Sequence, residues 1–140
     1  MITIDLELAK KLQSVCNEKG IKMPNSEDVW AKKRYHTSPY IIYGEEGVYP
    51  KWLIHATDAY AILAPAYTLD ELLEILPATI QADNEEHTVY FKSVIWGLNS
   101  DQWYVGYIYL DEHYKWFADT NPCDAAGKLL IWCIQEGYLK

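Results

Sequence analysis

The stretch Asn121-Pro-Cys-Asp-Ala-Ala-Gly-Lys-Leu-Leu-Ile-Trp-Cys-Ile-Gln-Glu-Gly137 decides the fold of this chain. Asn121 is a favoured N-cap residue, and Pro122 suits the first position of a helix. Gly137 is typical of the residue just past a helix end. Between these ends, apolar residues cover most of the helix circumference and leave only a narrow polar strip. We therefore expect a buried helix, because the stretch is too short to cross a membrane.

The segments just before this helix read as strands that it can cover. Residues Thr88 to Trp96, Gln102 to Leu110 and Tyr114 to Ala118 are rich in Val, Ile, Tyr, Trp and Phe. Asn99-Ser100 and Asp111-Glu112 suit two-residue hairpin loops between them. The sequence predicts an α+β fold: an antiparallel sheet of about four to five strands, an N-terminal helix, a short middle helix and the C-terminal helix packed on one face of the sheet.

Tight hairpins would fix which residues face each other in this sheet. Trp96 then faces Trp103 and Val94 faces Val105 across the first pair of strands. Across the second pair, Tyr109 faces Tyr114, Tyr107 faces Trp116 and Val105 faces Ala118. The opposite face, which we expect the C-terminal helix to cover, holds Phe91, Ile95, Ile108 and Phe117 around the small residues Ser93 and Gly106.

The aromatic face of the predicted sheet is the candidate binding site. It comprises Tyr90, Trp96, Trp103, Tyr107, Tyr109, Tyr114 and Trp116. Such side chains can lie half in water, because hydroxyl and indole N–H groups keep their hydrogen bonds, and they are enriched among interface hot spots. One alternative is that the first helix, or residues 52–66, closes over this face. Our functional hypothesis is that Tyr107, Tyr109, Tyr114 and Trp116 stay accessible and receive a partner, which can be a second copy of the chain.

Two further helices are predicted earlier in the chain. The first opens at Thr3 or Asp5, buries a stripe that includes Leu12 and Cys16, and ends at Gly20. Thr68-Leu-Asp-Glu71 is a capping box that opens a short middle helix before Pro77.

The segment between these helices is harder to interpret. Lys32-Lys33-Arg34 reads as a solvated loop, and Tyr40 to Tyr43 as a strand. Gly44-Glu-Glu-Gly47 then predicts a turn, with Val48-Tyr49 as a short return strand. Residues 52–66 show no clean period, which leaves a strand and irregular chain as alternatives. Gln81 to His87 reads as a polar, acidic loop.

Composition and charge limit the functions that the protein can have. The 140 residues suit one domain, 1–140, with a net charge of −8. Residues 1–34 hold seven Lys/Arg against five Asp/Glu, and the remainder holds five against fifteen. This acidic body predicts no binding of nucleic acid through it. No secretory leader or membrane-spanning run is expected, and three widely spaced cysteines indicate a reducing, cytoplasmic setting.

The sequence presents no catalytic signature, and we expect no catalytic residue, no cofactor and no metal. Asp111-Glu112-His113 could offer ligands to a metal, but a hairpin turn explains these residues better. Cys16 and Cys133 fall on apolar faces, where a thiol is inert.

Four segments together resemble small uncharacterised proteins of phages and prophages: Ile2 to Leu12, Ser26 to Trp30, Ala64 to Pro77 and Asp124 to Tyr138. The resemblance implies a mobile-element origin and a cytoplasmic setting, and it carries over no activity. We expect a non-catalytic binding or protein-interaction module. The alternatives are an acidic inhibitor of a host nucleic-acid enzyme and an enzyme of unknown class.

Overall fold

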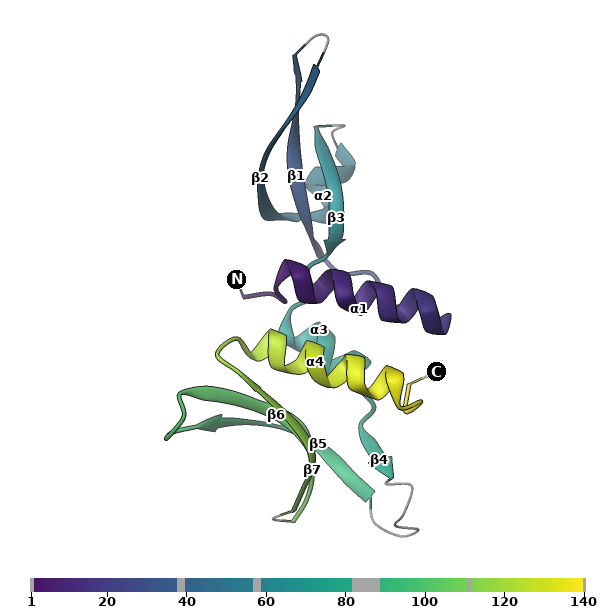
Figure 1. Cartoon of the computed structure of the whole chain (residues 1–140), viewed down its shortest axis with the longest axis vertical. Helices are drawn as coiled ribbons and strands as arrows, with labels where there is room; N and C mark the ends of the chain where they lie inside the picture. Colours follow the sequence, from purple (N-terminus) through teal and green to yellow (C-terminus); the bar gives the residue numbers. More distant parts are fainter. Residues whose placement is uncertain (1, 38–39, 57–58, 82–88, 111, 140) are drawn as a thin grey trace.

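The computed structural model describes residues 2–37, 40–56, 59–81, 89–110 and 112–139, and the predicted α+β class is confirmed. The predicted acidic loop 81–87 lies outside these residues apart from Gln81, as does the turn residue Asp111. Figure 1 shows three layers along the long axis: a three-stranded sheet with the short helix α2 (Lys51–Ala56) beside it at one end, the other helices in the middle and a four-stranded sheet at the other end. The elements are α1 (Leu6–Lys19), β1 (Asp28–Thr37), β2 (Tyr40–Pro50), α2 (Lys51–Ala56), β3 (Tyr60–Pro65), α3 (Leu69–Ile75), β4 (Thr79–Gln81), β5 (Val89–Gly97), β6 (Gln102–Tyr109), β7 (Glu112–Asp119) and α4 (Pro122–Gln135).

The buried C-terminal helix is confirmed as α4. The side chain of Asn121 accepts a hydrogen bond from the backbone N–H of Cys123, at 2.9 Å, and Pro122 occupies the first turn. Gly137 has φ +82°, the left-handed conformation that glycine adopts readily. The helix contacts α1 and α3 as well as strands β6 and β7. Nearly all of its circumference is therefore buried, as the apolar pattern predicts.

Two other predicted helix ends also form as expected. Gly20 closes α1 at φ +68°, and the N–H of Ile21 donates to the carbonyl oxygen of Cys16 at 2.9 Å. At α3, the side chain of Thr68 accepts from the N–H of Glu71, and the Glu71 carboxylate accepts from the N–H of Thr68. These ends depend on contacts within a few residues, which is why the sequence predicts them.

The strands fall into two sheets, whereas the sequence predicted one. The order is β2-β1-β3 in the first and β4-β5-β6-β7 in the second, and all pairs are antiparallel. The predicted turn Gly44 to Gly47 is wrong: these residues lie inside β2, opposite β1. The predicted loop Lys32 to Arg34 lies inside β1. The undecided segment 52–66 contains most of α2 and all of β3.

The first predicted hairpin register of the four-stranded sheet is confirmed, and the second is wrong. Trp96 pairs with Trp103 and Val94 with Val105, as predicted. In the next hairpin, however, Val105 pairs with Phe117 and Tyr107 with Lys115. Tyr109 pairs with Glu112, so the loop begins one residue earlier than predicted, at Leu110, whose φ is +54°. The register also shifts between Tyr107 and Ile108. These changes place Trp116 opposite Gly106 and turn it to the other face of the sheet.

Candidate interaction surfaces

The structure divides the predicted aromatic site between a buried and an open surface. Tyr90 and Tyr107 are buried in the main core, with Tyr107 0% exposed. Tyr114 packs on the same core, and its ring lies 4.8 Å from that of Tyr90. Trp103 is half-buried, and Trp96 and Tyr109 are exposed near the sheet ends. The prediction of one accessible face containing Tyr107, Tyr109, Tyr114 and Trp116 is therefore corrected.

Tyr107 belongs to the core because its hydroxyl has a partner there. The hydroxyl donates to the carbonyl oxygen of Pro77 at 2.6 Å, and Cys133 Sγ on α4 lies 4.0 Å from it. Burial, with the neighbouring thiol, raises the pKa of Tyr107 far above its ordinary value, so the phenol stays neutral. A neutral, hydrogen-bonded tyrosine can be buried as a core residue.

The face predicted to lie under the C-terminal helix is instead open. Phe91 is 55% exposed and Ile95 is 40% exposed. Trp116 is 47% exposed, and its ring lies 5.0 Å from that of Tyr104 on the same face. Gly106 allows this packing, because a Cβ there would lie 2.6 Å from the Trp116 Cβ. The open face is thus an apolar surface whose residues Phe91, Ile95 and Trp116 do not belong to the main core.

The first sheet carries the most exposed apolar segment of the described chain, which we call the arm: strands β1 and β2. Strand β3 pairs with residues 29–33 of β1 only, so the outer part of the arm is a two-stranded ribbon. Figure 1 shows this ribbon projecting away from the helices. Five large side chains near its end are 48–73% exposed: Tyr35, Tyr40, Ile41, Ile42 and Tyr43.

Sequence reasoning missed the arm because Gly44 and Gly47 suggested a turn. Lys32 Nζ instead lies 3.5 Å from Glu46 Oε1 across the two strands, and Gly47 pairs with Ala31. The available signal was the run Tyr40-Ile-Ile-Tyr43, which lacks the alternation of a strand with one face in water. A strand apolar on both faces lies in a core or at an interface, and no core surrounds this one.

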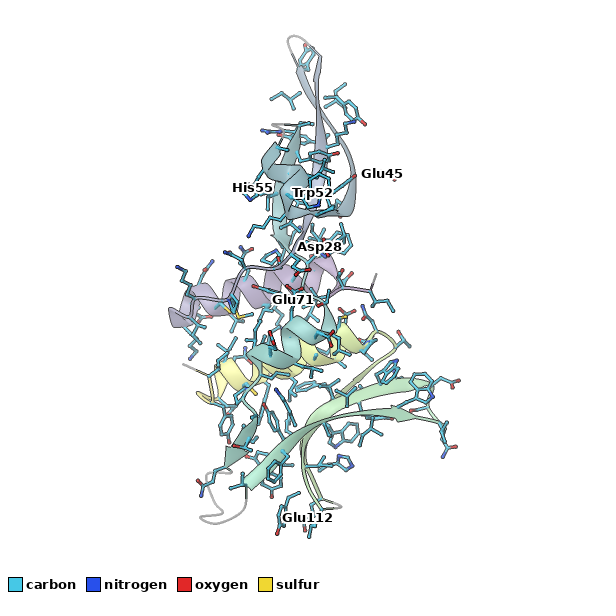
Figure 2. The ribbon with its side chains drawn as sticks, turned by 180° about the vertical axis from the view of Figure 1, so that it is seen from behind. Asp28, Glu45, Trp52, His55, Glu71 and Glu112 are labelled. Carbon is cyan, nitrogen blue, oxygen red and sulfur yellow. The ribbon has the colours of Figure 1, made fainter. Side chains whose placement is uncertain are left out.

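The ionisable side chains labelled in Figure 2 come from separate parts of the molecule: Glu45 and His55 near the arm, Asp28 and Glu71 near the helices, and Glu112 at the far end. Among the described residues, no three His, Cys, Asp or Glu side chains gather as a metal site would require. The three cysteines are buried and unpaired, and burial raises the pKa of each thiol, to about 12 for Cys133. None of the described helices is long and apolar enough to cross a membrane.

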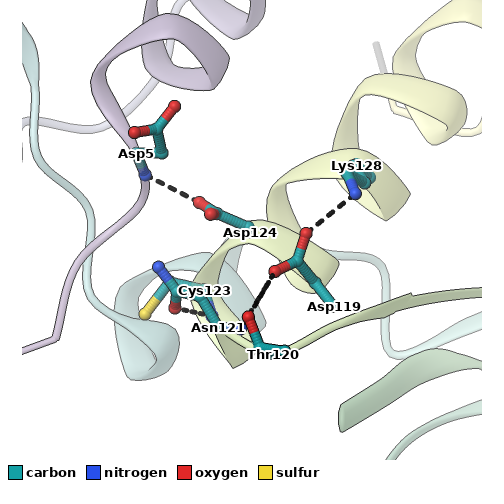
Figure 3. A network of polar contacts seen from close by, with 7 residues as sticks. All are labelled: Asp5, Asp119, Thr120, Asn121, Cys123, Asp124 and Lys128. Atoms are coloured by element: carbon teal, nitrogen blue, oxygen red, sulfur yellow. Dashed lines mark hydrogen bonds and ion pairs between the residues drawn. The ribbon is translucent and has the colours of Figure 1, made fainter. Parts of the chain in front are cut away.

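A polar network joins the N-terminal segment to the start of α4 (Figure 3). The carboxylate of Asp124 accepts from the N–H of Asp5 at 2.7 Å. The carboxylate of Asp119 accepts from the N–H of Asn121 at 3.0 Å and from Lys128 Nζ at 2.9 Å. These bonds satisfy backbone groups around the helix start. We interpret the network as structural.

This network predicts a loss of stability in acid. Burial alone would raise the pKa of Asp119, but the hydrogen bonds from Asn121 and Lys128 together hold it below the ordinary 3.8. The ionised form is thus favoured by folding, so its contribution is present above pH 3.8 and disappears as the pH falls through the folded-state pKa. The variant Asp119→Asn should lower the thermal midpoint at neutral pH, and its difference from wild type should shrink in acid.

The matched control is Glu18→Gln, which changes an exposed carboxylate on α1 that lies outside the network. Its midpoint should follow wild type throughout the titration. Asp124 has the opposite effect on the pH dependence of stability, because burial raises its pKa. The two carboxyl groups must therefore be tested by single variants. A gap between Asp119→Asn and wild type that stays constant through the acid range would contradict the assignment.

With the geometry described, the chain can be compared with known proteins. No model of a protein family, no curated protein and no solved structure matches it.

Proposed function

We propose that this protein is a non-catalytic interaction module that holds a protein partner on its arm. The observation that carries the proposal is the exposure of five large apolar side chains, Tyr35 and Tyr40 to Tyr43, on a ribbon that projects from the body. Exposed apolar clusters of this kind are typical of interaction sites. Tyrosine adds rigid contact area and a hydroxyl that stays hydrogen-bonded in water, which suits an exposed hot spot.

The backbone of the arm favours the same use. Strand β2 is the edge of its sheet, and one row of N–H and C=O groups along its 11 residues has no neighbouring strand within the described part of the chain. Such an edge can pair with an extended segment of another chain, so that backbone hydrogen bonds add affinity and the flanking side chains add specificity. In the four-stranded sheet the central strands β5 and β6 already pair on both sides, and the edge strand β7 is shorter than β2, with 8 residues.

The setting that we propose is that of a small cytoplasmic accessory protein of a phage or prophage. It rests on the resemblance of four segments and on three thiols that are not oxidised to disulfides. We favour an interaction module over an enzyme because the thiols, the strongest nucleophiles of the chain, are buried. Their raised pKa values keep them protonated and therefore unreactive.

A capture experiment with matched variants tests this proposal. Ile42→Asp places a charge in the middle of the exposed arm cluster. Leu98→Asp places the same charge on an 83% exposed leucine in the loop between β5 and β6, far from the arm. Both variants should keep the wild-type circular dichroism spectrum and unfolding midpoint, because both side chains are exposed.

We expect wild type and Leu98→Asp to retain the same partner from a bacterial lysate, and Ile42→Asp to lose it. The bound protein is identified by mass spectrometry. Sedimentation of the purified chain covers the case in which the partner is a second copy. Equal capture and equal self-association by all three proteins would remove the arm as the site.

A further inference from the structure

A cleft of about 430 Å³ lies at the base of the arm, between α1 and β3. Leu12 and Cys16 of α1 form one wall. Val29 of β1 and Leu63 of β3 belong to the other, and Met23 lies in the connecting segment. This volume falls within the range of small-molecule sites, which are mostly apolar with a few polar groups.

The charged side chains that line the cleft are positive, whereas the chain as a whole is negative. The lining contains two charged side chains, Lys22 and Lys51, and no Asp or Glu, although the whole chain has a net charge of −8. The three ion pairs formed within the described residues involve neither lysine. A neighbouring hollow is lined by Glu71 and Glu74 and lacks lysine, so the positive character of the cleft does not extend into it.

Neutral polar groups complete the lining. Gln13 and Asn17 lie on the exposed side of α1, one turn apart, and Asn25 lies in the connecting segment. The hydroxyl of Tyr67 donates to the carbonyl oxygen of Pro24, which holds that segment against the core. The cleft therefore combines an apolar floor, amide groups and two cations.

We propose that this cleft binds a small amphipathic anion, with an apolar body against Leu12, Cys16 and Leu63 and a carboxylate or phosphate head beside Lys22 and Lys51. An apolar body gains from burial against the floor of the cleft. A charged head gains charge-assisted hydrogen bonds from an ammonium group. A neutral ligand would gain the first contribution only, and a cation would be repelled.

Such a ligand would contact the arm and the helical layer at the same time. Val29, Ile62 and Lys51 belong to the first sheet and its short helix α2, whereas Leu12 and Gln13 belong to α1. The two parts are also joined by the hydrogen bond that the indole N–H of Trp30 in β1 donates to the carbonyl oxygen of Ile4, just before α1, at 2.9 Å. A bound ligand would therefore add a second link between the first sheet and α1.

Isothermal titration of the full chain with octanoate and with octan-1-ol tests this inference. The two probes share their apolar body and differ in the anionic head. We expect saturable binding of octanoate at one site and binding of octan-1-ol that is weaker by about tenfold or more. The double variant Lys22→Gln/Lys51→Gln should reduce the octanoate affinity to about that of the alcohol.

A second pair of variants locates the site. Gln13→Trp places a large side chain into the cleft from an exposed position of α1, and should abolish binding. Ser14→Trp adds the same side chain at the adjacent exposed position, which does not line the cleft, and should bind as wild type does. Circular dichroism and thermal midpoints confirm that both fold. Absence of saturable octanoate binding, equal affinity for the alcohol, or unchanged binding by Gln13→Trp would each overturn the inference.

Discussion

Replacing Leu130 by alanine should lower the free energy of unfolding by about 2–5 kcal/mol. Leu130 is 0% exposed and belongs to the main core, in the helix that contacts α1, α3 and strands β6 and β7. Removal of its side chain leaves a cavity at the centre of these contacts, and the surrounding elements can collapse only in part. Urea unfolding followed by tryptophan fluorescence measures the change.

Gln135→Ala is the matched control, because Gln135 lies at the end of the same helix and is exposed. Its effect should be within about 0.5 kcal/mol of zero. An unfolding midpoint for Leu130→Ala equal to that of wild type would show that α4 is peripheral, and would contradict the layered arrangement.

The second large effect is expected at Tyr107. Replacing it by alanine should lower the free energy of unfolding by about 3–5 kcal/mol, the range for truncating a large buried aromatic side chain. Trp116→Ala should cost about 1 kcal/mol, because Trp116 is 47% exposed and its main loss is an aromatic contact with Tyr104. The two residues face each other on one surface in the predicted register, and they lie on opposite faces in the structure. Similar losses for the two variants would support the predicted register instead.

Tyr107→Phe isolates the hydroxyl. The ring stays, but the carbonyl oxygen of Pro77 loses the donor that lies 2.6 Å away. A fully buried acceptor left without a partner costs about 1–3 kcal/mol, and we expect a loss near the lower end of this range because the bond is part-buried. A loss in this range for Tyr107→Phe, together with a larger loss for Tyr107→Ala, would show that both the ring and its hydrogen bond hold this tyrosine in the core.

The sequence by itself determined three of the helices, α1, α3 and α4, and several of their ends, but it did not predict α2. The cap at Asn121, the capping box at Thr68 and the closure at Gly20 each depend on side chains and backbone groups a few residues apart. Apolar patterning likewise identified α4 as buried and the first hairpin of the four-stranded sheet in its correct register. Local chemistry suffices for such features because the groups that interact are adjacent in the chain.

Only the tertiary structure decided which faces are buried and where the interaction surfaces lie. The register shift after Tyr107 moves the part of β7 beyond Tyr114 out of its predicted register, so that Trp116 and Phe117 exchange faces, because side chains alternate along a strand. The hydroxyl of Tyr107 then finds Pro77, thirty positions away, and the polar aromatic face becomes the core. The arm formed in the same way: Gly44 and Gly47 suit a turn locally, but β2 pairs with β1 on both sides of an irregularity at Gly44 and Glu45, and this satisfies more backbone groups than an early turn would. The distant partners that settle these choices cannot be read from local sequence.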